Sequence, residues 1–339
     1  MKRATLIRPR NFRIEEVPIP APEPNHLLIR VKICGICGSD IHAFHGTHPF
    51  ISCPIVLGHE FAGMVVATGE SARDEWKEGD RVIVEPSLTC GRCYNCRIGR
   101  YNICDDLKVI GCQSDGAFAE FLVVPVEKVI RLDEKLTYEE GALVEPLAVG
   151  VHAVDRAEVK EGQSVLIHGA GTIGLMVLQA AKARGATVII SDVLDTRLVL
   201  AKELGADYTI NVSKEPLDFS LKDVVPEGPD VILECSGTSI SLQEAIRVAR
   251  KGSRIVLVGV IDGLVPLPVS LIQDRELELV GDLMYTRQDF VRAQELIVEG
   301  QANVKRMISR VFPLDEVDKA FRYLEDNKKS TIKVLVSIS

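Results

Sequence analysis

A glycine-rich turn between a strand pattern and a helix pattern is the feature that most constrains the fold of this chain. Residues 164–168 are apolar and typical of a buried strand, and the turn after them reads G-x-G-x-x-G, with its glycines at 169, 171 and 174. A helical pattern follows over 173–184, and a second strand pattern over 187–191 leads to Asp192. This order predicts a βαβ unit that binds a dinucleotide.

The residues of this turn have distinct expected roles. Gly169 permits the tight turn, Gly171 lets a pyrophosphate approach the backbone, and Gly174 lets the helix pack closely on the strand. The first helical residues, Thr172 and Ile173, supply N–H groups at the positive end of the helix dipole. A glycine turn with a purely structural role is the alternative interpretation.

Asp192 and Arg197 predict which dinucleotide binds. Asp192 follows Gly174 by eighteen residues, about where a carboxylate binds the ribose 2′-hydroxyl. The same charge repels a 2′-phosphate, so the sequence predicts NAD as the cofactor. Arg197 is expected over the adenine, and a solvated helix charge is the alternative for this residue.

The remaining patterns predict an α/β protein in which one domain is inserted into another. Short strand patterns bounded by Gly, Pro or Asp precede residue 146, whereas strands alternate with helices after it, as in a doubly wound parallel sheet. We expect a mainly β domain over residues 1–145, an inserted Rossmann-type domain over 146–285, and a C-terminal return to the first domain over 286–339.

Composition excludes several functional classes. The 339 residues are 46% hydrophobic and 26% charged with a net charge of −8, so the chain is globular and a nucleic-acid partner is not expected. No apolar run reaches the roughly 18 residues of a membrane span. The N-terminus lacks the apolar core of a signal peptide, and we expect a cytoplasmic protein.

Four of the nine cysteines predict a structural zinc site. Cys90, Cys93, Cys96 and Cys104 follow the pattern C-x2-C-x2-C-x7-C, in a lobe over about residues 88–106. Four thiolates in one short lobe are typical of a closed tetrahedral zinc site. An iron–sulfur cluster is the alternative, but the short last spacing and the trailing proline of that motif are missing.

A second set of residues predicts a zinc site with an open position. Cys37, His59 and one carboxylate would supply three ligands and leave the fourth position for a substrate. Adjacent side chains of an extended segment point to opposite faces, so Glu60 joins His59 only if the backbone bends. Glu145 has no such constraint, and it either binds the metal or holds the metal-bound water. Core or surface roles are the alternative for each residue alone.

The motifs of this chain resemble, over its whole length, those of the zinc-dependent medium-chain alcohol dehydrogenases, and they come in the same order. They are C-G-I-C-G-S-D at 34–40, G-H-E at 58–60, the four-cysteine lobe, E-P at 145–146 and the glycine turn. The stretches 40–46 and 115–120 look like the polyol and sugar-acid branch, which includes sorbitol, threonine and L-galactonate or L-gulonate dehydrogenases. The resemblance implies a GroES-like catalytic domain, NAD, two zinc ions per subunit, and a homotetramer or homodimer. It also implies Cys37, His59 and Glu60 as ligands of the catalytic zinc, with Glu145 near the metal.

The resemblance further implies oxidation of a secondary hydroxyl of a polyol or sugar acid. Zinc would acidify the alcohol and NAD would take the hydride. Ser39 is then expected to accept the proton and His42 to release it to solvent, whereas His45 and His48 are expected to be surface histidines.

The substrate is less constrained by the sequence. Sorbitol-type enzymes carry an Arg-Tyr pair where this chain has Met284 and Tyr285, and Arg287 is placed to pair with a substrate carboxylate. These two features favour an aldonate such as L-galactonate or L-gulonate. An L-threonine 3-dehydrogenase, a sorbitol- or butanediol-type dehydrogenase, and a non-catalytic dinucleotide-binding structural or sensor protein are the alternatives.

Overall fold

The computed structural model describes residues 1–338, and the chain divides into two compact units. The first unit contains residues 1–145, 286–298 and those from 304 onward, and the second contains residues 146–285 and 299–303. The tail belongs to the first unit because its last strand, β18 (Lys333–Ser337), lies inside the sheet of that unit, between β3 (His26–Gly35) and β17 (Ile308–Pro313). No helix within residues 1–338 is long and apolar enough to cross a membrane.

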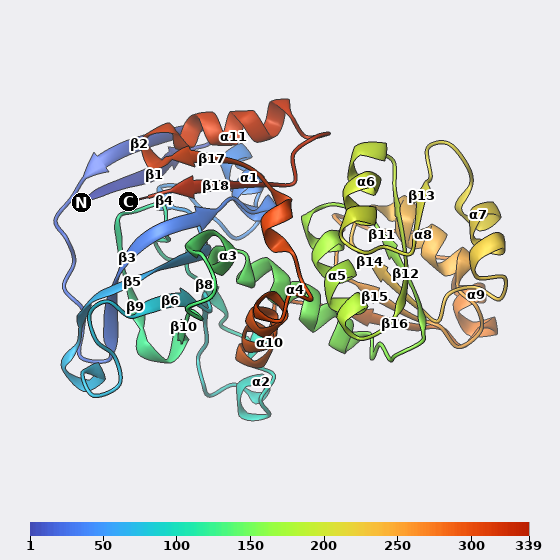
Figure 1. Ribbon diagram of the computed structural model, residues 1–339, viewed down its shortest axis with the longest axis horizontal. Coiled ribbons are helices and arrows are strands. Elements are labelled where there is room, and N and C mark those ends of the chain that lie inside the picture. The colour runs from blue at the N-terminus through green and yellow to red at the C-terminus, as the bar shows by residue number, and fades with distance from the viewer. Residues whose placement is uncertain (339) are drawn as a thin grey trace. The chain divides into compact units, whose positions relative to one another are not determined.

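The first unit is built on a seven-stranded sheet, in which β3 pairs with β5 (Glu60–Thr68), β9 (Phe121–Pro125) and β18 (Figure 1). Near the end of β3, Gly35 is opposite Glu60 of β5 on one side and opposite Leu335 of β18 on the other. Segments about 300 residues apart in the chain therefore meet at one end of this sheet.

The helices and strands of this unit are β1 (Lys2–Arg8), β2 (Asn11–Glu16), β3 (His26–Gly35), α1 (Gly38–His45), β4 (Ile55–Val56), β5 (Glu60–Thr68), β6 (Arg81–Val84), β7 (Ser87–Leu88), α2 (Tyr94–Arg97), β8 (Lys108–Val109), β9 (Phe121–Pro125), β10 (Val129–Arg131), α3 (Tyr138–Ala142), α10 (Arg287–Val298), β17 (Ile308–Pro313), α11 (Val317–Asp326) and β18 (Lys333–Ser337).

An aromatic cluster packs α1 and α11 into the core of the first unit. The ring of Phe44 on α1 lies 5.0 Å from that of Phe321 on α11, and Phe12 lies 4.9 Å from Phe321. Phe44 and Phe321 are fully buried. Burial of these rings fixes the position of α1, the helix that follows Cys37.

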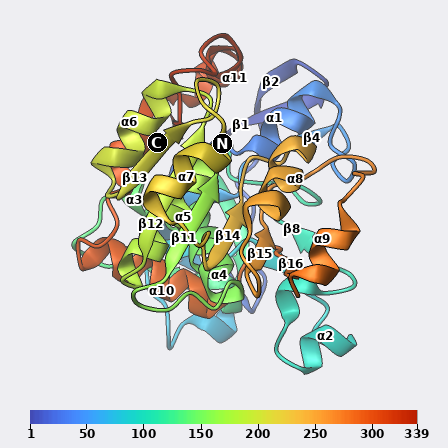
Figure 2. The ribbon, with the colours of Figure 1, turned by 90° about the vertical axis from the view of Figure 1, so that its right-hand side faces the viewer.

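The second unit is a six-stranded parallel sheet with strand order β13-β12-β11-β14-β15-β16 and helices packed on it (Figures 1 and 2). The strand order reverses between β11 and β14, and doubly wound sheets bind ligands at such a switch point. Its elements are α4 (Val144–Arg156), which begins at the boundary, β11 (Ser164–His168), α5 (Thr172–Ala183), β12 (Thr187–Asp192), α6 (Asp195–Glu203), β13 (Tyr208–Asn211), α7 (Leu217–Val224), β14 (Val231–Glu234), α8 (Ser239–Val248), β15 (Arg254–Leu257), α9 (Val269–Asp274) and β16 (Glu278–Gly281).

Candidate metal and dinucleotide sites

The structure brings Cys37, His59 and Glu60 together in the first unit. One donor atom from each lies within 4.8 Å of the other two. His59 and Glu60 can converge because His59 lies in the loop before β5, which begins at Glu60, so strand alternation does not separate their side chains. Gly58, with a φ of +99°, turns the chain just ahead of this pair. Glu145 is buried at the start of α4 and lies outside this set. The departure from an extended segment that Glu60 required is therefore present.

Asp40 supports two members of this set from behind. Its Oδ2 accepts a hydrogen bond of 2.8 Å from the Cys37 N–H, and its Oδ1 lies 3.7 Å from Nδ1 of His59. Burial raises the pKa of Asp40. Burial lowers the pKa of His59, but the charges of Asp40 and Cys37 outweigh it and raise that pKa well above its usual value. At 3.7 Å the carboxylate makes no hydrogen bond to the ring, and it acts on His59 through its charge.

Lys333 contacts Glu60 from the C-terminal strand. Its Nζ lies 2.7 Å from each carboxylate oxygen of Glu60 and donates to the carbonyl of Ile36 at 3.2 Å. Gly35 leaves room for this carboxylate, because a Cβ on Gly35 would lie 2.1 Å from a Glu60 oxygen. Charge interactions with Glu60, Cys37 and Glu145 oppose the effect of burial and raise the pKa of Lys333.

A half-buried thiol and a buried imidazole and carboxylate that converge in this way fit a zinc ion. They supply three protein ligands of the types that zinc prefers, and a fourth position stays open, as in catalytic zinc sites.

The four cysteines of the lobe also converge. Their sulfur atoms lie within 4.8 Å of one another. Backbone N–H groups of Asp105 and Cys96 lower the pKa of Cys93 to about 6, whereas burial and the thiols of Cys93 and Cys104 raise the pKa of Cys96 to about 12. Four thiols at these distances ionise together only beside a cation, so the cluster fits a closed zinc site.

The glycine turn of the second unit has the geometry of a phosphate cradle. Gly169 has a φ of +93°, and a Cβ on Gly174 would lie 1.8 Å from the carbonyl oxygen of Gly169. Gly171 has nothing within 4 Å of its Cβ position, so a ligand can approach the backbone there. Thr172 and Ile173 begin α5 immediately after it.

Asp192 lies at the end of β12, beside this turn. It accepts hydrogen bonds from the N–H groups of Ala170 and Leu194 at 2.7 and 2.9 Å. Arg197 lies 3.8 Å from the carboxylate, and both residues line a pocket of about 450 Å³ that also includes Gly169 and Gly171. The pocket fits the adenosine half of a dinucleotide.

The other predicted site residues in the first unit lie outside the two sets of converging metal ligands. Ser39 and His42 are three residues apart in α1, and Nδ1 of His42 lies 3.5 Å from the hydroxyl of Thr47. His45 forms an ion pair with Glu325 rather than lying free at the surface.

The Arg287 guanidinium donates to the carbonyls of Glu127 and Val129, both at 2.9 Å. These bonds remove Arg287 as an argument for an acidic substrate.

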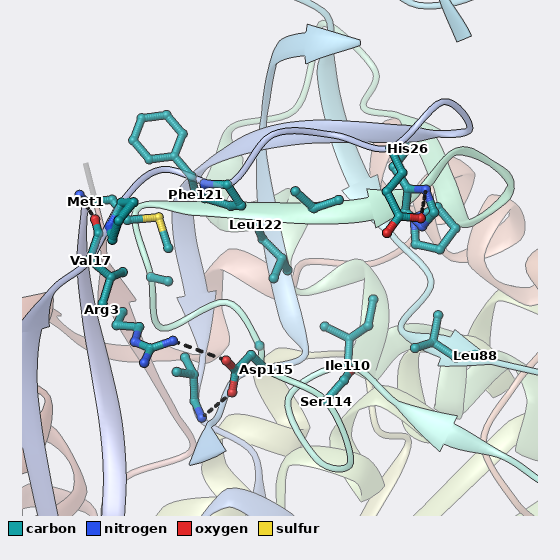
Figure 3. A pocket seen from close by; sticks show the side chains of 18 residues that line it. Met1, Arg3, Val17, His26, Leu88, Ile110, Ser114, Asp115, Phe121 and Leu122 are labelled. Carbon is teal, nitrogen blue, oxygen red and sulfur yellow. Dashed lines mark hydrogen bonds and ion pairs between the residues drawn. The ribbon is translucent and has the colours of Figure 1, made fainter. Parts of the chain in front are cut away.

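A further pocket of about 500 Å³ lies in the first unit, beside β9 (Figure 3). Figure 3 shows Phe121 and Leu122 along this pocket, with an ion pair between Arg3 and Asp115. It shares no lining residue with the candidate metal sites or with the pocket beside Asp192.

Two family models match the chain. One describes the alcohol dehydrogenase GroES-like domain and matches residues 23–134, and the other describes a zinc-binding dehydrogenase and matches residues 172–299. Sorbitol dehydrogenase of Bacillus subtilis is 35% identical, over 99% of this chain and 97% of its own length. The chain belongs to the zinc-dependent medium-chain alcohol dehydrogenase family.

Solved structures of other family members have the same fold. 2R,3R-butanediol dehydrogenase of Bacillus subtilis is 32% identical, with a TM-score of 0.92 and 99% of both chains covered. The rspB alcohol dehydrogenase of Escherichia coli CFT073, complexed with NADH, is 33% identical, with a TM-score of 0.93 and 99% coverage of both chains. A zinc-binding dehydrogenase of Sinorhizobium meliloti 1021 bound to NADP is 36% identical, with a TM-score of 0.92 and coverage of 99% and 98%. These findings confirm the predicted fold class and enzyme class for this zinc-type dehydrogenase.

Sequence analysis missed two residues of the metal site of this family member. Asp40 had a signal, because a carboxylate three residues after the residue that precedes a helix is typical of a capping box. Lys333 had a weaker one: a single lysine within an apolar strand pattern is unusual. Its partner, Glu60, is 273 residues away and was not predictable.

Proposed function

We propose that this protein is an NAD-dependent dehydrogenase that oxidises a secondary hydroxyl of a polyol. The convergence of Cys37, His59 and Glu60 is the observation that carries the proposal. Zinc bound by these residues would lower the pKa of an alcohol, and the nicotinamide would accept the hydride. Sorbitol and butanediol dehydrogenases among the relatives support a polyol as the substrate.

The residues around the zinc ligands have supporting roles in this proposal. Asp40 acts on His59 through its charge, and Lys333 holds the carboxylate of Glu60 by hydrogen bonds. Ser39 and His42, which the spacing of α1 places on one side of the helix, carry the alcohol proton toward solvent. Glu145 remains a charged neighbour of the site rather than a third ligand.

Two further features support the proposed cofactors, NAD and a second zinc ion. Asp192 favours NAD over NADP, because a 2′-phosphate would lie against a carboxylate that two backbone N–H groups hold in place. Cys90, Cys93, Cys96 and Cys104 bind a second zinc ion, which has no open position and therefore stabilises the fold.

An aldonate such as L-galactonate or L-gulonate is the second candidate substrate. The missing arginine of the Arg-Tyr pair favours it, since Met284 stands where sorbitol-type enzymes have arginine. We place it after a neutral polyol because Arg287 already donates to two carbonyl groups of the chain.

A substrate comparison tests these proposals. The zinc-loaded protein is assayed with NAD against sorbitol, 2R,3R-butanediol, L-galactonate, L-threonine and 2-butanol. We expect kcat/KM for the best polyol to exceed that for 2-butanol at least about tenfold, since polar groups built for a second hydroxyl stay unpaired with a monoalcohol. A higher kcat/KM for L-galactonate or L-threonine than for either neutral polyol would contradict the proposal that the substrate is a neutral polyol. If the protein binds two zinc ions but oxidises none of these compounds, a non-catalytic role would be favoured.

A further inference from the structure

The loop between α1 and β4 contains a histidine, His48, that the proposed chemistry does not use. Its Nδ1 accepts a hydrogen bond of 3.1 Å from the N–H of Phe50. A ring nitrogen that accepts carries no proton, so the proton of the neutral ring is on Nε2. Within residues 1–338, no group accepts a hydrogen bond from this Nε2. His48 therefore offers one free N–H donor in a fixed tautomer.

Contacts through a neighbouring turn link this loop to the candidate zinc ligands. The Gln113 side chain donates to the carbonyl of Phe50 at 3.2 Å and accepts from the N–H of Val109, which fixes its amide. Cys112, the preceding residue, contacts the ring of His59. The loop is thus attached beside His59 through two consecutive residues.

Electrostatics agree with this position. Burial, together with the charges of His42 and His59, lowers the pKa of His48. Its imidazole therefore lies within electrostatic range of both the proposed proton carrier and a proposed zinc ligand. The ring is half-buried and packs edge-on against Phe50, with 6.3 Å between centroids, so its orientation is restrained.

We propose that His48 is a substrate-binding residue whose Nε2–H donates a hydrogen bond to the hydroxyl next to the reacting carbon. The inference rests on the proposed polyol dehydrogenase function and deepens it. A neutral donor held at the edge of the metal site recognises a second hydroxyl on the substrate, and it offers nothing to a monoalcohol. His48 would then determine specificity, whereas His45 is tied to Glu325.

Two alcohols that differ by one hydroxyl group test the proposal. 2R,3R-butanediol and 2-butanol are compared on the zinc-loaded wild type and on His48→Leu, His48→Gln and His26→Leu. In His48→Leu we expect kcat/KM for the diol to fall roughly 3- to 10-fold, mainly through KM, and that for 2-butanol to change less than about twofold. His48→Gln retains an N–H near Nε2 and should recover most of the loss. His26→Leu, which alters a half-buried histidine of β3, should change neither value.

Equal losses for the two alcohols in His48→Leu, or no loss for the diol, would overturn the proposal. Equal losses would indicate a disturbed loop rather than a missing hydrogen bond. Binding of both alcohols to the enzyme–NADH complex, followed by NADH fluorescence, gives a readout that does not need turnover. Selective weakening of diol binding in His48→Leu without oxidation by the wild type would refute the proposed activity and support the role of His48.

Discussion

The ammonium group of Lys333 lies 2.7 Å from each carboxylate oxygen of Glu60, and the two residues are 2% and 1% exposed. Each ion therefore depends on the other for charge compensation when no metal is bound. Removal of one partner from a buried pair is far more destabilising than removal of both.

Lys333→Met is expected to lower the free energy of unfolding of zinc-stripped protein by about 3–5 kcal/mol, as measured by urea denaturation. Lys2→Met is the matched control: it breaks an exposed pair with Asp315, at 2.9 Å, and should leave the free energy of unfolding nearly unchanged. The double variant Glu60→Gln/Lys333→Met should regain much of the lost stability. Similar losses of unfolding free energy in Lys333→Met and in Lys2→Met would show that the buried pair stabilises the fold no more than an exposed pair does.

The two proposed zinc ions should separate by function. Cys37→Ser is expected to retain one zinc per chain by elemental analysis, to keep its melting temperature within a few degrees, and to lose at least ~99.9% of its turnover. Cys93→Ser should also retain one zinc, but its melting temperature should fall by roughly 5–15 °C, because a closed site contributes folding energy. If Cys93→Ser lost its activity while its melting temperature stayed unchanged, the roles assigned to the two zinc ions would be wrong.

Asp192 should set the cofactor preference. We expect kcat/KM with NAD to exceed that with NADP by at least ~100-fold, and Asp192→Asn to reduce the ratio to below about tenfold, since the variant removes the charge but keeps a hydrogen-bonding side chain. Asp195→Asn, which changes an exposed carboxylate at the start of α6, is the control and should leave the ratio unchanged. A wild-type ratio near one would contradict this role for Asp192.

His168 should make the protein sensitive to acid. Burial lowers its pKa to about 4, well below the usual value near 6.5, so the unfolded chain binds this proton more readily than the folded one. The stability linked to His168 is complete above pH 6.5 and is lost as the pH falls toward 4, by about 2 kcal/mol between pH 7 and pH 5. Between pH 7 and pH 5, the free energy of unfolding of His168→Leu should therefore fall by about 2 kcal/mol less than that of the wild type. His26→Leu should show the same fall as the wild type. An unchanged loss in His168→Leu would refute the assignment.

Local patterns explain which elements could be predicted from the sequence. The strand pattern at 164–168 matches β11, and the one at 187–191 lies within one residue of β12, because an apolar run bounded by turn residues indicates a strand without distant information. The predicted helix over 173–184 also lies within one residue of α5 at each end. The glycine turn was equally visible, since its constraints are local to the backbone.

Long-range relationships at the metal site were not predictable in the same way. The choice between Glu60 and Glu145 depended on where the strand begins relative to His59 and Glu60, and a residue pattern does not fix a strand boundary to one residue. Arg287 was expected to pair with a substrate carboxylate, but its guanidinium donates to carbonyl groups about 160 residues earlier in the chain. Tertiary partners decide the function of such charged side chains.

The position of Lys333 in β18 has a consequence for the order of events during biosynthesis. Glu60 leaves the ribosome 273 residues before Lys333, and at roughly 5–20 residues per second this interval lasts about 15–55 seconds. Throughout it, a nascent chain contains the carboxylate of Glu60 without its counter-ion, and β3 without its neighbour β18. The inserted second unit is translated entirely within that interval, so it can fold before the first unit is complete.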